Sequence, residues 1–162
     1  MYQPSWEGCE STEIYEKYPL QLISPHSKYS FHTMGDGKDS NINDIDEHRR
    51  LINGFRYWIF RMNPKDAEAR GLKNDDIVEV YNDRGNVLCA LQITERVPAG
   101  TVHSYEACAD YIPMGEPGGD GVVEKNGCIN NLTNKRFIVQ HAHGMSANSC
   151  LVEVRKWEGE TE

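Results

Sequence analysis

Two neighbouring segments with alternating side chains place the strongest limit on the fold. Residues 75–81 (DDIVEVY) and 87–94 (VLCALQIT) each alternate apolar and polar residues, and the turn-forming sequence NDRGN lies between them. A period of two is typical of a strand with one buried face, and a short turn between two such segments predicts a β-hairpin. This hairpin indicates a β-rich fold class.

Further segments agree with that class. Strands are expected at residues 18–24, 55–61, 101–107 and 150–156. One short helix is expected between Asn63, a good N-cap followed by a proline, and Gly71, and another around residues 45–51. Two long polar loops, residues 26–53 and 113–130, complete the chain. Strands joined by tight hairpins favour a closed barrel, because closure removes exposed sheet edges.

Composition excludes several classes of protein. The 162 residues fit one domain or one domain plus a tail, and carry a formal net charge of −8. This charge argues against nucleic acid as a partner, and the absence of a long apolar segment argues against a membrane. Five scattered cysteines without CxxC spacing, and no signal peptide, predict a cytoplasmic protein with reduced thiols.

The loop that follows the first expected strand is a candidate binding site. Residues 24–33 (SPHSKYSFHT) nearly all carry hydrogen-bonding side chains. Hydroxyls, imidazoles and backbone N–H groups at the end of a strand can hold an anion such as phosphate. The alternative is a polar surface loop with two ordinary histidines.

A second candidate lies at residues 126–136 (NGCINNLTNKR). The amides of Asn130, Asn131 and Asn134 offer donor and acceptor together, which suits a purine or pterin edge, and Lys135 and Arg136 could meet phosphate. The alternative is an ordinary turn, where asparagine and glycine are common.

Other chemistry has little support. His141 and His143 would share a face of an extended segment, but no third ligand lies at a supporting spacing, so we expect no metal site. The nucleophile motif GxSxG and the glycine–lysine phosphate loop are absent from the sequence, and we expect no catalytic residue.

Taken in order, these segments resemble one known module. The pattern NPxDAxxRGLxxxDxVxVxxxRG, the loop SPHSKYSFHT, the segment INNLT and the terminal LVEVRK are similar to the C-terminal molybdopterin-dinucleotide-binding domain of the dimethyl-sulfoxide-reductase family of molybdenum and tungsten enzymes. The resemblance covers residues 18–156. It implies a mainly β fold, a six-stranded double-psi β-barrel with short helices and two long loops.

The resemblance also implies a cofactor, part of a bis-(molybdopterin guanine dinucleotide). Segments such as IDEHRR and HAHGMSANSCLVEVRKW look closest to family members that transfer hydroxyl groups between pyrogallol and phloroglucinol. Carried over position by position, the expected cofactor-binding residues are Ser24, His26, Ser27, Ser30, His32, Thr33, Tyr105, Asn131, Thr133 and Asn148.

The parts of the family that carry chemistry have no counterpart here. The ligand of molybdenum or tungsten, the iron–sulfur cysteines and the acid–base residues belong to earlier domains of such enzymes. We therefore expect a fragment of a larger oxidoreductase that is catalytically silent alone. Its expected parts are a tail or linker at residues 1–17, the barrel at 18–157 and a tail at 158–162. Its expected partners are the remaining domains of the catalytic subunit and an iron–sulfur electron-transfer subunit.

Two other hypotheses stay open at this point. A stand-alone double-psi barrel could serve as an interaction or adaptor module without cofactor. A small metal-binding or hydrolytic β-domain could use His141, His143 and an acid.

Overall fold

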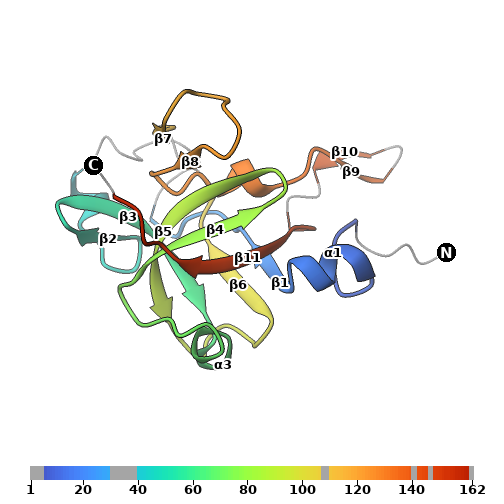
Figure 1. The fold of residues 1–162 in the computed structure, drawn as a ribbon, viewed down its shortest axis with the longest axis horizontal. Coiled ribbons are helices and arrows are strands. Elements are labelled where there is room, and N and C mark those ends of the chain that lie inside the picture. The colour runs from blue at the N-terminus through green and yellow to red at the C-terminus, as the bar shows by residue number, and fades with distance from the viewer. Residues whose placement is uncertain (1–5, 30–39, 107–109, 140–141, 146–147, 161–162) are drawn as a thin grey trace.

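Six strands close into a barrel in the computed structural model, which describes residues 6–29, 40–106, 110–139, 142–145 and 148–160 (Figure 1). The elements run along the chain as α1 Thr12–Lys17, β1 Leu20–Ile23, α2 Ser40–Asn43, β2 Arg49–Ile52, β3 Phe55–Met62, α3 Pro64–Glu68, β4 Ile77–Asn82, β5 Gly85–Ile93, β6 Thr101–Ser104, β7 Pro113–Met114, β8 Val123–Glu124, the 3-10 helix η1 Ile129–Leu132, β9 Phe137–Val139, β10 Ala142–Met145 and β11 Leu151–Lys156.

The barrel closes through one parallel pairing. Its strands follow the order β3, β6, β1, β11, β4, β5, and β5 returns to β3 with Ile59 opposite Ala90. A second parallel pair joins β1 to β6, with Leu22 opposite Val102. The expected hairpin is present, since β4 and β5 pair in antiparallel fashion up to Asn82 and Gly85. The predicted mainly β, six-stranded double-psi barrel is confirmed.

One expected helix is wrong. Residues 45–51 do not form a helix: α2 lies earlier, and Arg49–Ile52 forms β2, which pairs with β3. Asn53 and Gly54 connect the two strands with φ values of 50° and 82°. Two consecutive residues with positive φ form the tight hairpin turn that the Asn-Gly dipeptide favours. The turn sequence therefore determines a strand where the side-chain pattern suggested a helix.

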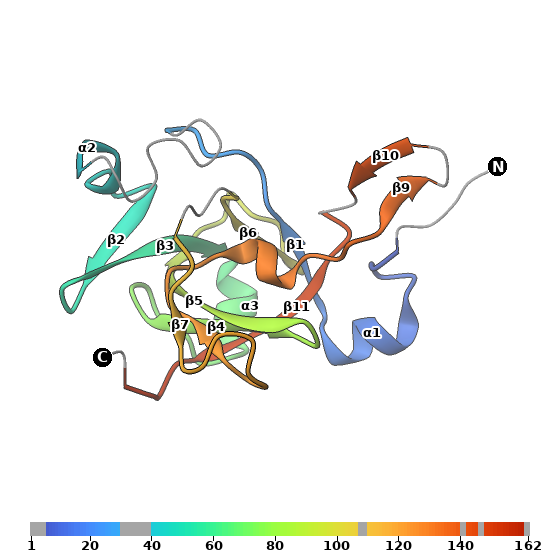
Figure 2. The same ribbon diagram turned by 90° about the horizontal axis from the view of Figure 1, so that it is seen from above.

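Both long loops contain short elements of their own. The first carries α2 and β2, and the second carries β7, β8 and η1. Strand β8 pairs in parallel with the start of β5, so that the second loop lies against the β4–β5 hairpin (Figure 2).

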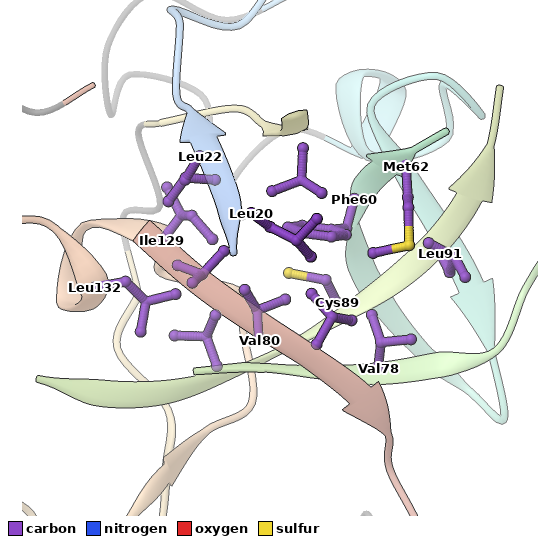
Figure 3. Packing of buried hydrophobic residues seen from close by; sticks show 14 of the residues in the cluster. Leu20, Leu22, Phe60, Met62, Val78, Val80, Cys89, Leu91, Ile129 and Leu132 are labelled. Carbon is purple, nitrogen blue, oxygen red and sulfur yellow. The ribbon is translucent and has the colours of Figure 1, made fainter. Parts of the chain in front are cut away.

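Apolar side chains from every barrel strand fill the interior. Figure 3 shows those of β1, β3, β4 and β5 converging with two from η1. The cluster consists of Leu20, Leu22, Phe60, Met62, Ala67, Leu72, Val78, Val80, Val87, Cys89, Leu91, Val102, Ile129, Leu132, Cys150, Val152 and Val154. Burial at about 25 cal/mol per Å² makes this cluster the main stabilising contribution.

Strands β3 and β5 are buried on both faces. A second cluster, around Tyr57, Leu88, Ala90 and Val123, packs on the outside of these strands. This explains why the sequence from Tyr57 to Phe60 is continuously apolar or aromatic. A strand covered on two sides needs no alternation.

The short helix α3 follows its sequence signals. The side chain of Asn63 caps it by accepting a hydrogen bond from the Lys65 N–H at 3.0 Å, and Gly71 follows with φ 66°. Among the described helices, none is both long enough and apolar enough to cross a membrane.

Gly127 provides a test of how closely the second loop packs against β3 and β5. It adopts φ 72°, and a Cβ there would lie 3.0 Å from Cβ of buried Trp58 and 3.2 Å from the Leu88 carbonyl oxygen. We expect Gly127→Ala to lower the free energy of unfolding by about 2–3 kcal/mol, from backbone strain plus overlap. Gly71→Ala, with open space around the new Cβ, should cost only about 1 kcal/mol. Urea unfolding of both variants checks this, and equal losses would contradict the packing argument.

Candidate functional site

A polar groove of about 910 Å³ lies beside the β4–β5 hairpin turn. One wall is the hairpin turn, another is the glycine-rich loop at residues 118–122, and a third is η1 with the residues that follow it. Five side-chain amides line it, those of Asn82, Asn86, Asn130, Asn131 and Asn134. The amides of Asn82 and Asn134 are buried and bond within the chain. The other three, on exposed or half-buried residues, each carry a donor and an acceptor and can match a ligand whose edge alternates the two.

The position of η1 depends on the carbonyl oxygen of Leu132. That oxygen accepts hydrogen bonds from Asn82 Nδ2 at 2.9 Å, Arg84 Nε at 2.6 Å and Cys150 Sγ at 3.1 Å. Burial raises the pKa of the Cys150 thiol to about 11, so the thiol is protonated and can donate. Because Leu132 lies between Asn131 and Thr133, these contacts also fix the two groove residues that the resemblance nominated.

Ser24 and Asn148 meet at the end of β1. The Ser24 N–H donates to Asn148 Oδ1 at 2.9 Å, and Gln21 Nε2 donates to the Asn148 carbonyl at 2.7 Å. Ser24 is only 5% exposed, yet its hydroxyl has no hydrogen-bond partner among the described residues. A buried hydroxyl without a partner is costly, and a ligand that bonds to it would remove that cost.

The loop after β1 is tied to the chain that leaves β6. His26 Nδ1 lies 2.5 Å from Glu106 Oε1, and the Glu106 N–H donates to the Pro25 carbonyl at 3.0 Å. These contacts follow from the parallel pairing of β1 and β6, because parallel strands end at the same edge. The two loops therefore form one surface.

Behind this surface lies a cluster of rings. Ser27 Oγ is 3.0 Å from Nδ1 of His48, which is fully buried. The His48 ring packs on Trp58 at 4.4 Å between centroids and on Tyr105 at 6.3 Å. His103 meets the edge of Tyr105 at 4.9 Å. The predicted residues Ser27 and Tyr105 thus belong to one packed unit.

Both histidines of the cluster are neutral at pH 7. Burial, with a smaller effect from the adjacent Arg49 charge, lowers the pKa of His48 to about 4. Burial and the Arg61 guanidinium lower the pKa of His103 to about 4. These imidazoles therefore add no positive charge beneath the surface formed by the two loops.

The predicted site residues fall into two groups. Ser24, His26, Ser27, Tyr105 and Asn148 surround the loop after β1, whereas Asn131 and Thr133 line the groove. The segment before β11 lies between the groups, since Asn148 contacts Ser24 and the next residue, Ser149, accepts from Asn134 through its carbonyl. Ser30, His32, Thr33 and His141 lie outside the described residues.

Sequence reasoning missed several residues of the site. The sequence predicted only a turn at Asn82, Arg84 and Asn86, and only a polar loop around His48. Neither segment contains a pattern that is typical of a binding site. The pairing of β5 with β8, which places the glycine-rich loop against the hairpin, has no local signal. The two loops rich in hydrogen-bonding side chains were found, and Asn130, Asn134 and Lys135 of the second loop line the groove as predicted.

Comparison with known proteins agrees with this architecture. The family model described as the molydopterin dinucleotide binding domain matches residues 20–151, and the chain belongs to this family. It is therefore a domain that binds a molybdopterin dinucleotide, and its cofactor is a molybdopterin guanine dinucleotide. Membership supports the cofactor-binding hypothesis over the adaptor hypothesis.

Individual relatives are much longer than this chain. The pyrogallol hydroxytransferase large subunit of Pelobacter acidigallici is 50% identical over 159 residues, which cover 98% of this chain and 18% of that protein. A trimethylamine-N-oxide reductase of Haemophilus influenzae is 34% identical over 96% of this chain and 18% of its own length. The solved structure of acetylene hydratase from Pelobacter acetylenicus has a TM-score of 0.63 and 16% identity, and covers 97% of this chain and 21% of that one. The chain thus spans about a fifth of their length.

The residues present fit the cofactor. The buried Ser24 hydroxyl, which has no partner within the described part of the chain, lies beside a loop of donors, and the groove contains amides that can bond to pterin or guanine edges. Within the described residues, no cluster of three His, Cys, Asp or Glu side chains is arranged to hold a metal ion.

The buried His48 predicts a pH dependence of stability. An exposed histidine has a pKa of about 6.5, so between that value and about 4 the unfolded chain binds a proton that the folded chain does not. Stability is therefore lost as the pH falls through this window, by about 2–3 kcal/mol from His48.

The lowered pKa of His103 also destabilises the folded protein as the pH falls. His48→Asn should therefore reduce the pH dependence of the free energy of unfolding by about half rather than remove it. Urea unfolding of the wild-type and variant proteins at pH 7 and pH 5 measures the difference. An unchanged difference would show that His48 is not a neutral buried group.

Proposed function

We propose that the amide-lined groove and the loop after β1 are the two surfaces by which this domain holds a molybdopterin guanine dinucleotide. The observation that carries the proposal is that Asn131 and Thr133, nominated from sequence, line the same groove as four other amide side chains. The groove takes the heterocyclic edge, and Ser24, His26 and Ser27 face the anionic part of the cofactor.

The role of this chain is binding and orientation. The cofactor, when bound, supplies the metal and dithiolene chemistry. Asn131 orients it by pairing a donor and an acceptor, and Lys135 adds positive charge at the groove wall. The Ser24 hydroxyl donates or accepts a hydrogen bond from its buried position. His48 holds Ser27 in place without charge.

We also propose that the chain is one domain of a larger catalytic subunit that transfers hydroxyl groups on pyrogallol-type trihydroxybenzenes. Support comes from the higher identity to the pyrogallol hydroxytransferase subunit, 50%, than to the trimethylamine-N-oxide reductase, 34%. Its partners would be the other domains of that subunit and an iron–sulfur electron-transfer subunit. We place it in the cytoplasm because Cys9, Cys89 and Cys150 are free thiols.

A direct experiment tests the whole proposal. The protein is isolated from its source cells with an antibody against this domain, and its size, molybdenum, tungsten, pterin content and pyrogallol hydroxyl transfer are measured in the same fractions. We expect a subunit several times larger than 18.4 kDa that co-elutes with pterin and metal. A species of 18.4 kDa without either would overturn the proposal.

A substitution tests the groove. Asn131→Ala removes one donor and one acceptor from the cofactor, and we expect cofactor to dissociate about tenfold faster or more, as for the loss of 1–2 hydrogen bonds. Pterin remaining after prolonged dialysis of the holoenzyme is the measurement.

Asn74→Ala is the matched control. The Asn74 side chain accepts from the Ile93 N–H, in a part of the barrel that shares no residue with the groove. It should retain pterin as the wild type does. Equal retention by Asn131→Ala and the wild type would remove Asn131 from the site.

A further inference from the structure

We propose that Glu7, which precedes the barrel in the chain, is a positioning residue for the cofactor groove. It holds the wall formed by η1 and the residues after it through two separate connections. This inference rests on the proposed function, because it assigns a purpose to a rigid groove wall. Its structural part, the dependence of the wall on Glu7, can be tested without cofactor.

The first connection runs through Arg84. Glu7 is 5% exposed, and its carboxylate accepts from Arg84 Nη1 at 2.6 Å, from Arg84 Nη2 at 2.9 Å and from the Leu151 N–H at 3.1 Å. The remaining nitrogen of that guanidinium, Nε, donates to the Leu132 carbonyl at 2.6 Å. One planar group therefore transmits the position of Glu7 to η1.

This arrangement requires an arginine. Burial lowers the pKa of the Arg84 guanidinium, but the hydrogen bonds and charge of Glu7 outweigh burial and the pKa is raised, which keeps the cation in place. A guanidinium presents donors in fixed directions, so two nitrogens can engage a carboxylate while the third engages a carbonyl. A lysine ammonium has one nitrogen and cannot span both partners.

The second connection runs through Ser149. The Glu7 N–H donates to Ser149 Oγ at 2.8 Å, and Ser149 Oγ donates to the Glu7 carbonyl at 3.2 Å. The carbonyl of Ser149 accepts from the side chain of Asn134 in the groove. Glu7 therefore reaches the same wall at Leu132 and at Asn134.

The two connections enclose the proposed cofactor contacts. Asn131 and Thr133 lie immediately on either side of Leu132, and Thr133 also separates Leu132 from Asn134. Loss of the Glu7 carboxylate leaves Arg84 without its charged partner in a half-buried position, which weakens its hold on the Leu132 carbonyl. The wall then samples more positions, and fewer of them present Asn131 correctly to the cofactor.

The test compares two glutamate substitutions in the holoenzyme. Glu7→Gln breaks the Arg84 pair, and Glu153→Gln breaks a similar two-point pair with Arg70, at 2.6 and 3.1 Å, away from the groove. We expect both variants to lose thermal stability, but only Glu7→Gln to release pterin faster, by about fivefold or more. Only Glu7→Gln should also speed hydrogen exchange at the backbone amides of residues 131 and 133.

Two further variants test the same connections in case Glu7→Gln does not fold. Arg84→Lys keeps the positive charge but loses the two-nitrogen contact with the Glu7 carboxylate. It should reproduce both the faster release of pterin and the faster amide exchange. Ser149→Ala removes only the second connection and should give a smaller change of the same kind. Glu7→Gln combined with Arg84→Lys should be no worse than either alone, because both break the same connection.

The outcomes separate the two proposals. Unchanged amide exchange at residues 131 and 133 in Glu7→Gln would overturn the positioning role, whatever the cofactor content. Faster exchange with wild-type pterin retention would overturn the link between this wall and the cofactor. A protein that contains no pterin would overturn the proposed function, while the exchange data would still decide whether Glu7 orders the wall.

Discussion

The parallel pairing of β3 with β5 is the constraint on which the rest of this structure depends. It converts a strand order that would otherwise leave two edges into a closed barrel. Closure places alternate side chains of all six strands in one interior cluster, and Figure 3 shows those of β1, β3, β4 and β5 gathered there. Tyr57 and Leu88 belong to a second cluster that packs on the outside of β3 and β5. The two strands that close the barrel are therefore buried on both faces.

Closure also determines where the polar loops meet. Because β1 and β6 are parallel, the loops that follow them lie at the same edge of the barrel, where His26 contacts Glu106. The rings of His48 and Tyr105 pack beneath these two loops. The parallel contact of β8 with β5 carries the glycine-rich loop to the hairpin turn and completes the groove. A rigid barrel thus orients loops that have little regular structure themselves.

Local signals in the sequence predict the framework well and the site only in part. The β4–β5 hairpin and the α3 helix follow from side-chain alternation and capping residues. The helix expected at residues 45–51 is wrong because the Asn53-Gly54 turn outweighs the side-chain pattern. Asn131 could be nominated through its segment, whereas nothing local indicates that Glu7 reaches Arg84, a contact between positions 77 residues apart.

The contacts of Glu7 also bear on the order in which the chain becomes organised. The hydrogen bond from Leu151 to Glu7 joins residues 144 positions apart, close to the two ends of the sequence. Contacts of such separation form late in folding, since they require most of the chain to be ordered first. The groove wall therefore becomes fixed only after β11 has joined the barrel, late in the folding of this domain.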